Sequence, residues 1–362
     1  MRVNSLDISN LRNIKSARIV TNPCLNCFTG DNGAGKTTVL EALAVLSKGR
    51  SFRAGQVSSL IGPEQPHFQI VSKIESQAGS LHQLGMERSV DSWLARHNGE
   101  NVSQLSDLTE LLPYVLLEPS SHTLVSGPPD GRRKYLDWGV FHVKHSFLVL
   151  WRRYSRTLKQ RNAALRQANQ AVVESLDPLL IALGEELHQA REYHAGKLSD
   201  LLEITLPLFN QTLEGICLNY RKGWSSGSLE DSLSQSFQRD MDRGATGPGP
   251  HKADLVFSLG GHPAKERLSR GEQKAMTAAL ILAQAKMISE SGNSPILLLD
   301  DLSSEFDEDH LLRVLRAVIE LGIQIWLTGA NISPSLLKAK AITDAGVSMF
   351  HVEHGVVSQA NV

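Results

Sequence analysis

The sequence predicts an α/β fold that a long helical insertion interrupts. Three observations lead to this prediction. A glycine-rich loop at residues 30–37 joins a short apolar strand to an amphipathic helix. A second apolar strand, Pro295–Leu299, ends in two aspartates more than two hundred residues later. Between the two, apolar residues recur at spacings of three, four and seven, which indicates two long helices.

The glycine-rich loop fits the pattern G-x-x-x-x-G-K-[ST] without a mismatch. A strand at Cys24–Phe28 precedes it, and a helix from Thr37 to Leu46 follows, as the pattern requires. Glycine amides and a helix N-terminus together favour phosphate oxygens. We therefore predict an ATP site in which Lys36 reaches the β- and γ-phosphates and the Thr37 hydroxyl binds Mg²⁺. The predicted ATP contacts are Arg12, Gly30, Asp31, Asn32, Gly33, Ala34, Gly35, Lys36, Thr37 and Thr38.

The two aspartates after the second strand are the expected partners of that loop. We predict that Asp300 holds Mg²⁺, directly or through water, and that Asp301 orients or deprotonates the attacking water. Acidic residues often follow strands for no functional reason, but the glycine-rich loop favours the functional interpretation here. Asp301 and Lys36 are the predicted catalytic residues.

A third motif, at residues 268–273, has the form L-S-x-G-[EQ], which is the signature of ABC-type ATPases. A serine hydroxyl and a glycine amide at a helix N-terminus can face a phosphate. The alternative is an ordinary capping box between Ser269 and Glu272. Because the motif precedes the strand with two aspartates, we predict a signature made of Ser269, Gly271 and Glu272, and hence an ABC-type ATPase head.

The chain divides into three parts by composition. The head takes residues 1–144 and 251–362, and a helical hairpin, resembling a short coiled coil, takes residues 145–221. We expect its helices to break at Asp177-Pro178. Residues 222–250 are rich in Gly, Ser and Pro, which predicts a mobile connection.

Ten Lys or Arg residues lie between positions 132 and 166, against the single acidic residue Asp137. Such a basic face favours DNA phosphates, although a solvated helix face is the simpler explanation from the residues alone. Arg132 and Arg133 also have a possible structural role. The predicted DNA contacts are Arg132, Arg133, Arg152, Arg153, Arg156 and Lys159.

The overall composition narrows the class of protein further. The net charge is −1, so the chain as a whole is not basic, and no apolar run reaches the ~20 residues that cross a bilayer. The three cysteines favour a reducing, cytoplasmic setting without a membrane partner. Cys24 and Cys27 lie three apart in a predicted strand, so they point to opposite faces and we expect them to pack rather than to bind metal.

Four stretches make a more specific resemblance possible. They are Asn10-Leu11-Arg12-Asn13, the P…LV-x-G-x-P-x-x-RR-x-x-LD pattern at residues 119–137, the G-x-T-x-x-G-P-H pattern at residues 244–255, and Asp300-Asp301 with the S-E-F-D that follows at residues 304–307. Together they resemble the RecF family of bacterial recombination-mediator ATPases, whose heads are similar to those of SMC proteins. Lys252 and Ala253 depart from the arginine and aspartate of that family.

The resemblance implies an ATP-dependent homodimer in which Ser269, Gly271 and Glu272 of one copy cover the ATP of the other. It implies binding to single-stranded, gapped or junction DNA and help in loading recombinase together with mediator proteins such as RecR. ATP and Mg²⁺ are the implied cofactors. Asp301 is one methylene shorter than the glutamate that is common at this position in transporter ATPases. We therefore expect slow hydrolysis that times a switch.

Three alternatives stay open from the sequence. The first is the ATPase subunit of an ABC transporter, which is more compact between loop and signature and carries a histidine where this chain has Leu327-Thr328-Gly329. The second is a structural SMC-like head, whose helices run much longer than residues 145–213 allow. The third is a nucleotide-gated scaffold that barely hydrolyses ATP.

Overall fold

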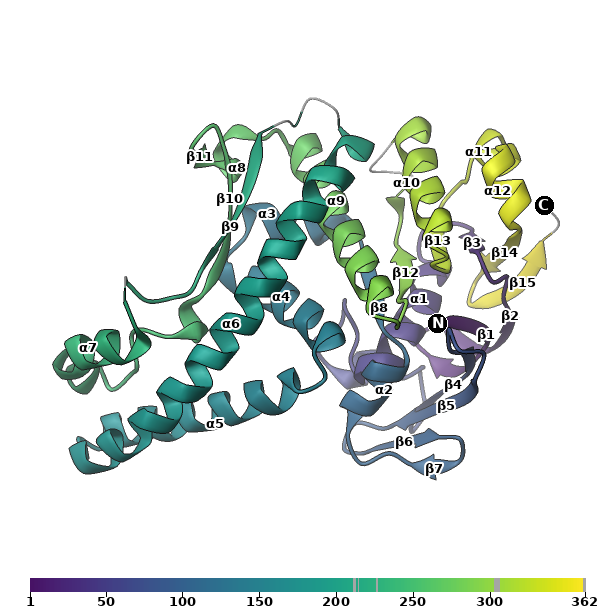
Figure 1. Ribbon diagram of the computed structural model, residues 1–362. Helices are drawn as coiled ribbons and strands as arrows, with labels where there is room; N and C mark the ends of the chain where they lie inside the picture. The colour runs from purple at the N-terminus through teal and green to yellow at the C-terminus, as the bar shows by residue number, and fades with distance from the viewer. Residues whose placement is uncertain (211–212, 214, 226, 303–306, 361–362) are drawn as a thin grey trace. The chain divides into compact units, whose positions relative to one another are not determined.

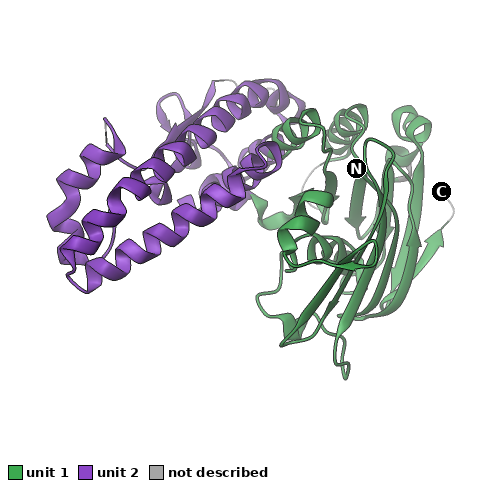
Figure 2. Ribbon diagram, turned by 60° about the horizontal axis from the view of Figure 1, so that its bottom comes forward, with its two compact units in different colours: residues 1–121, 281–362 green, residues 122–280 purple. Residues whose placement is uncertain are grey.

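The computed structural model describes residues 1–362 except 211–212, 214, 226, 303–306 and 361–362. The chain forms two compact units, residues 1–121 with 281–362 (unit 1) and residues 122–280 (unit 2), which Figure 2 shows in two colours. Unit 2 is therefore inserted into unit 1 along the sequence. No helix of the described residues is both long and apolar enough to cross a membrane.

Unit 1 contains a mostly parallel sheet that the apolar strands of the sequence build. Its order is β15-β14-β3-β13-β12-β8. Only the pair β14 and β15 is antiparallel. The strands are β3 (Leu25–Thr29), β8 (Tyr114–Leu117), β12 (Ile296–Leu299), β13 (Ile325–Gly329), β14 (Val347–Glu353) and β15 (Val356–Ala360).

The second sheet of unit 1 is antiparallel and has the order β2-β1-β4-β5-β6-β7. Its alternation of buried and exposed residues matches the polar–apolar alternation of the sequence. Strands β1 and β2 form an antiparallel hairpin. The strands are β1 (Arg2–Leu11), β2 (Ile14–Val20), β4 (Phe68–Glu75), β5 (Leu81–Arg88), β6 (Trp93–His97) and β7 (Glu100–Asn101).

Helix α1 (Lys36–Lys48) lies between these two sheets, since it contacts β13 of one and β1, β4 and β5 of the other. It is apolar around most of its circumference, and the run from Val39 to Ser47 is fully buried. One continuous apolar cluster joins both sheets to this helix. The glycine-rich loop is thus fixed to the most deeply buried helix of the unit.

Shorter helices complete unit 1. Helix α10 begins at the N-cap Asp307, whose carboxylate accepts from the His310 amide. The helices are η1 (Val57–Ser59), α2 (Leu105–Leu111), η2 (Pro119–His122, which reaches unit 2), α10 (Glu308–Glu320), α11 (Pro334–Lys338) and α12 (Lys340–Ala345). Helix α9 (Arg270–Glu290) belongs to both units.

Unit 2 is dominated by the antiparallel pair α5 (Phe147–Arg166) and α6 (Gln170–Phe209), which lie side by side (Figure 1). A three-stranded antiparallel sheet of order β11-β10-β9 accompanies them. The other elements are α3 (Thr123–Ser126), α4 (Pro129–Val143), β9 (Ile216–Arg221), α7 (Leu229–Arg243), η3 (Pro250–Lys252), β10 (Asp254–Leu259), β11 (His262–Pro263) and α8 (Ala264–Arg267).

The predicted helix break at Asp177-Pro178 is wrong. Helix α6 continues through Pro178, and the break lies at residues 167–169, where Ala168 has φ +52° and Asn169 caps the next helix. A proline inside a helix costs about 3 kcal/mol. Packing of α6 on α5, which buries Leu180 and Leu183, outweighs that cost.

The predicted mobile connection at residues 222–250 is also wrong for most of its length. Helix α7 occupies residues 229–243 and starts with a capping box in which Ser228 and Asp231 bond to each other's amides. The Ser-x-x-Asp spacing was a visible helix start signal. The surrounding glycine and serine residues concealed it.

The boundaries of the compact units differ from the predicted domain boundaries at 144/145 and 250/251, both of which lie inside unit 2. Helix α4 accounts for the first difference, because it packs on α6 and β10 rather than on the sheets of unit 1. Strand β10 accounts for the second, because it pairs with β9.

Candidate nucleotide-binding site

The glycine-rich loop runs from the end of β3 to the start of α1, and two of its glycines have conformations that need glycine. Gly30 has φ +146°, and a Cβ there would lie 2.1 Å from the Val352 carbonyl oxygen. Gly35 has φ +120° and packs against Asn13. The sequence therefore folds the loop tightly against neighbouring backbone, which leaves amides at the helix N-terminus for a ligand.

Lys36 is buried, and its ammonium folds back over the loop. It donates to the carbonyl oxygens of Gly30 at 2.7 Å and Asp31 at 2.9 Å. Both acceptors are neutral, and Lys36 forms no ion pair with a described carboxylate. An anion placed there gains a charge-assisted hydrogen bond that backbone carbonyls cannot match.

Asp300 lies across from the helix start and connects it with two strands. The Thr37 hydroxyl donates to Asp300 Oδ1 at 2.8 Å, and the Thr328 hydroxyl donates to the same oxygen at 2.7 Å. Thr328 belongs to β13, which separates β3 from β12 in the sheet. Two hydroxyl groups thus hold the carboxylate in one orientation.

Asp301 follows directly and has φ +53°, an uncommon conformation for a residue with a side chain. Its amide donates to the Thr328 hydroxyl at 3.0 Å. This turn carries the Asp301 side chain into the lining of the same cleft as Lys36 and Asp300. The residues of the aspartate motif at 303–306 lie outside the described residues.

Arg12 and Asn13 come from the hairpin turn between β1 and β2. Arg12 forms a bidentate ion pair with the fully buried Glu41 of α1, with nitrogen–oxygen distances of 2.5 and 2.7 Å. Asn13 donates to the carbonyls of Gly33 and Ala34. The hairpin turn therefore supports the glycine-rich loop from a second sheet.

These groups surround a cleft of about 680 Å³ within unit 1. Among the predicted ATP contacts, Gly30, Asp31 and Ala34 support the cleft through their carbonyls. The others lie on its surface, together with Asp300 and Asp301. Sequence reasoning missed the further lining residues Asn13, Arg53, Glu118, Pro119, Ser120 and Thr328.

Glu118 is the most informative of the missed residues. It follows β8 just as Asp300 follows β12, and these two strands pair in register so that Leu117 lies opposite Leu299. Burial raises the pKa of the Glu118 carboxyl and the nearby Asp300 adds to the effect, while a hydrogen bond from Ser120 opposes it. Four apolar residues followed by an acid, as at Ile296–Asp300, was the signal that could have found it.

The predicted signature lies at the start of α9, in unit 2. Ser269 and Glu272 form the capping box: the Ser269 amide donates to Glu272 Oε2 at 2.8 Å, and the Glu272 amide donates to Ser269 Oγ at 3.3 Å. Ser269 and Gly271 are exposed, and a Cβ on Gly271 would meet nothing within 4 Å. The capping box therefore leaves Ser269 and Gly271 exposed in the same turn.

The predicted DNA contacts separate into two groups. Arg132 forms a bidentate ion pair with Asp254, at 2.7 and 3.0 Å, and Arg133 donates to the Ala253 carbonyl and lies 3.7 Å from Asp130. These two arginines connect the 119–137 stretch to the 244–255 stretch, so they hold the fold together. The exposed residues of the set are Arg152, Arg153, Arg156 and Lys159, all on α5.

A cavity of about 710 Å³ in unit 2 gathers part of this basic set. Residues of α4, α5 and α6 line it, with Arg152, Arg156 and Lys159 from α5. The half-exposed indole of Trp151 belongs to the same lining. Arg156 and Lys159 form no ion pair with any described residue.

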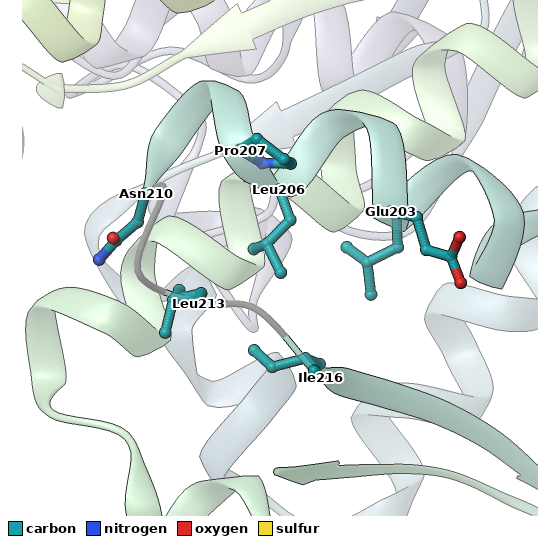
Figure 3. A pocket seen from close by; sticks show the side chains of 8 residues that line it. Glu203, Leu206, Pro207, Asn210, Leu213 and Ile216 are labelled. Atoms are coloured by element: carbon teal, nitrogen blue, oxygen red, sulfur yellow. The ribbon is translucent and has the colours of Figure 1, made fainter.

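Another cavity, of about 460 Å³, lies between the end of α6 and the start of β9 (Figure 3). Leu206, Pro207, Leu213 and Ile216 give it a mostly apolar wall, and Glu203 is the one carboxylate among its described residues. None of its described lining residues belongs to the candidate nucleotide site. Burial raises the pKa of the Cys27 thiol to about 12, so this thiol is not a candidate reactive group.

Comparison with known proteins decides the family. The family model for the RecF/RecN/SMC N terminal domain matches residues 2–356. The chain is 38% identical over 367 residues to the DNA replication and repair protein RecF of Xanthomonas axonopodis pv. citri (strain 306), with 99% of each chain covered. The chain belongs to the RecF family. It is also 37% identical to the RecF of Pseudomonas paraeruginosa (strain DSM 24068 / PA7), covering 99% of this chain and 98% of that one.

Solved structures agree with this assignment at the level of fold. A structure of the recombination mediator protein RecF-ATP in the RecFOR pathway matches at TM-score 0.86 and 23% identity, covering 99% of this chain and 98% of that one. A Smc head domain from Pyrococcus furiosus with an extended coiled coil matches at TM-score 0.58 and 14% identity, covering 100% and 96%. The predicted α/β head with an inserted helical region is thereby confirmed, and the RecF family membership favours it over a transporter subunit.

Proposed function

We propose that this chain is an ATP-binding switch of recombinational DNA repair and replication restart. One observation carries the proposal: Lys36, Thr37 and Asp300 meet in a single nucleotide-sized cleft at the end of a glycine-rich loop. Family membership supplies the cellular role, because the relatives are named DNA replication and repair proteins.

The cleft suits a triphosphate with Mg²⁺. Loop amides and the start of α1 bind phosphate oxygens, and Lys36 moves from the Gly30 and Asp31 carbonyls to the β- and γ-phosphates. Mg²⁺ prefers hard oxygen ligands and usually takes few of them from protein. The Thr37 hydroxyl and the Asp300 carboxylate, 2.8 Å apart, are the donors that would hold it. The bound ion would neutralise charge on the phosphates.

Asp301, which lines the cleft, is the proposed catalytic residue of hydrolysis. Its carboxylate would orient or deprotonate a water at the γ-phosphate. Its short side chain and its left-handed backbone restrict how far the carboxylate reaches. We infer slow turnover suited to a timed switch. A turnover rate in purified protein as high as that of transport ATPases would contradict this inference.

The proposal includes closure of two copies around two ATP molecules. The exposed Ser269 and Gly271 of one copy would face the γ-phosphate held by Lys36 of the other. The exposure of Ser269 and Gly271 at the start of α9 supports this arrangement. Loading of recombinase with mediator proteins such as RecR is part of the proposal, and the fold shared with a recombination mediator protein RecF of the RecFOR pathway supports it.

Sedimentation with and without ATP and Mg²⁺ tests the ATP-gated dimer. Wild-type protein should shift from monomer to dimer, and both Lys36→Arg and Ser269→Arg should abolish the shift. The two variants fail for different reasons, because Ser269→Arg alone should still bind ATP. Mixing the two variants should restore one composite site, since each supplies what the other lacks. Unchanged dimerisation in either variant would contradict the proposed closure of two copies around two ATP molecules.

DNA binding is proposed for the exposed basic face of α5, made of Arg152, Arg153, Arg156 and Lys159. Arg156 and Lys159 also line the cavity beside this face. Neither forms an ion pair with a described carboxylate, so DNA phosphates would not have to displace one. Contacts of this kind recognise phosphates without reading bases. We therefore expect binding to single-stranded, gapped or junction DNA with little sequence preference.

A salt titration of DNA affinity tests this face. Each lost phosphate contact lowers the slope of log affinity against log salt by roughly 0.7–0.9. The double variant Arg156→Ala/Lys159→Ala should reduce that slope by about 1.5, while Arg18→Ala, an exposed arginine of β2, should not change it. DNA binding that does not depend on salt would contradict the proposal.

A further inference from the structure

Unit 2 contains a third cavity, of about 640 Å³ and of different chemistry, on the side of the sheet edge formed by β9. Three aromatic side chains line it: His188 of α6, Tyr220 of β9 and Trp224 just beyond that strand. None of them belongs to the nucleotide cleft or to the basic face of α5. The candidate site described above leaves this cavity unexplained.

The aromatic rings are arranged as a stacking surface. His188 and Tyr220 lie nearly parallel, with an interplanar angle of 17° and ring centroids 5.7 Å apart. Trp224 stands edge-on to His188 at 78°, with centroids 5.1 Å apart. Burial lowers the pKa of His188, so its ring is neutral at pH 7 and stacks as an uncharged heterocycle.

Cations surround this aromatic group. Lys222 lies 4.9 Å from the centroid of the Trp224 ring and donates to the Gly227 carbonyl, which fixes its position. Arg221 and Lys252 are exposed on the same lining. Of the two acids there, Asp254 is already neutralised by Arg132, which leaves Glu192 as the one carboxylate without an arginine partner among the described residues. The cavity is therefore positive as well as aromatic.

The position of Lys252 is built into the fold. Gly223 has φ +95°, and a Cβ there would lie 2.3 Å from the Gly249 oxygen. The Gly249 amide donates to the Gly223 carbonyl at 3.1 Å, so the turn that carries Lys252 is held against the chain that carries Trp224. The 244–255 stretch noted in the sequence thus contributes a cation to the rim of this cavity.

His188 Nδ1 and Trp224 Nε1 are buried without a hydrogen-bond partner among the described residues, and the Tyr220 hydroxyl, which interacts with Arg191, makes no hydrogen bond of standard geometry. Buried polar groups in proteins are nearly always paired. A ligand with both donors and acceptors at the edge of a planar ring would supply the missing partners.

We propose that this cavity binds one unstacked base of single-stranded DNA, with the adjoining phosphate held by Lys222 and Lys252. A flat apolar ring that also carries hydrogen-bonding edges and a neighbouring negative charge satisfies the aromatic group, the unpaired atoms and the cations together. A cationic ligand is disfavoured by the positive lining. The inference deepens the proposed DNA binding and rests on it for the identity of the partner.

Fluorescence anisotropy with two labelled oligomers of equal length and charge tests the proposal: oligo(dT) and an abasic deoxyribose-phosphate chain. Wild-type protein should bind oligo(dT) about 5- to 100-fold more tightly than the abasic chain. Trp224→Ala should remove this preference while leaving abasic binding unchanged, and Trp224→Phe should retain most of it. The control is Trp93→Ala, an exposed tryptophan of unit 1, which should leave the preference intact.

The outcomes separate this proposal from the function on which it rests. Equal affinity of wild type for both oligomers, or an undiminished preference in Trp224→Ala, overturns the base pocket but not DNA binding. Failure to bind either oligomer overturns the base pocket together with the single-stranded part of the proposed DNA binding. Ultraviolet cross-linking of 5-iodouracil oligomers should label the peptide that contains Trp224. If an acidic aromatic peptide binds in a Trp224-dependent way and the oligomers do not, the cavity is a protein-docking site and the proposal fails.

Discussion

Both units of this protein bury charged side chains, but they bury them for different purposes. In unit 1 the buried charges Lys36, Glu41 and Asp300 all lie at or just behind one cleft. In unit 2 the buried charges are Arg161, Arg191 and Asp240, and each is neutralised inside the fold. Burial of a charge therefore does not by itself mark a site.

What distinguishes the two units is whether the buried group is satisfied by another charge. Lys36 is held only by neutral carbonyls and faces a cleft. Arg161 pairs with Asp177 at 2.6 Å and Asp240 at 3.0 Å and also donates to Thr246. The first arrangement leaves a charge for a ligand, whereas the second joins α5, α6 and α7 into one structure.

The largest expected effect comes from breaking the buried network of unit 2. Arg161→Met leaves Asp240, which is 1% exposed, without its cation. Removing one partner of a buried ion pair costs about 3–5 kcal/mol. Hydrogen exchange should show faster deuterium uptake in peptides of α5, α6 and α7, while α1 of unit 1 keeps its protection.

Two further variants sharpen this prediction. Arg153→Met, on the exposed side of the same helix, should change stability by no more than about 0.5 kcal/mol. The double variant Arg161→Met/Asp240→Leu should recover part of the loss, because it removes the unpaired carboxylate as well. If the double variant is no more stable than Arg161→Met, the cost does not come from an unpaired charge.

The same contrast explains how far the sequence could predict the structure. The loop at residues 30–37 and the strand ending at Asp300 were predictable, because phosphate chemistry demands fixed residue types at fixed spacings. Helix α7 and the true break at residues 167–169 were not predicted. The local start signals at Ser228 and Asn169 were hidden by the composition around them. The tertiary partners that stabilise both helices are not visible in the sequence, since Arg161 holds Asp240 of α7 and Asp177 of α6.

Arg132 teaches the same lesson for the candidate DNA face. The basic residues around Arg132 in the sequence favour a phosphate contact. Its partner Asp254 lies more than a hundred residues away, and only the fold brings the two together. Glu118 follows four apolar residues, as Asp300 does, but only the pairing of β8 with β12 shows that its acid lies beside Asp300.

Acid pH should also separate the two units. Burial lowers the pKa of His194 to about 4 and that of His251 to about 4, and both lie in unit 2. The ordinary pKa is 6.5, so the unfolded chain takes up protons between pH 6.5 and 4 that the folded chain refuses, and stability is lost as pH falls through that window. For His194 alone the loss reaches about 3 kcal/mol at pH 4.

Calorimetric unfolding at pH 7 and pH 4.5 measures this loss. ATP should raise the transition of unit 1 and so identify it. His194→Asn, which does not titrate, should make the other transition less sensitive to acid even if it lowers stability at pH 7. An equal loss of stability in wild type and variant between these pH values would contradict the assignment to His194.

The smallest expected effect tests whether the charge at the cleft of unit 1 serves a ligand. Glu118 lies beside Asp300, where two carboxylates repel the phosphates of ATP unless a cation lies between them. Glu118→Gln removes one of these charges without changing the size of the side chain. We expect ATP affinity to rise in the absence of Mg²⁺ and to fall slightly in its presence, so that the ratio of the two affinities changes about tenfold, or roughly 1.4 kcal/mol.

Titration calorimetry with ATP, with and without Mg²⁺, measures the ratio. The control is Glu64→Gln, which changes an exposed acid of unit 1. An unchanged ratio in Glu118→Gln would mean that this carboxylate, like those of unit 2, is satisfied within the fold.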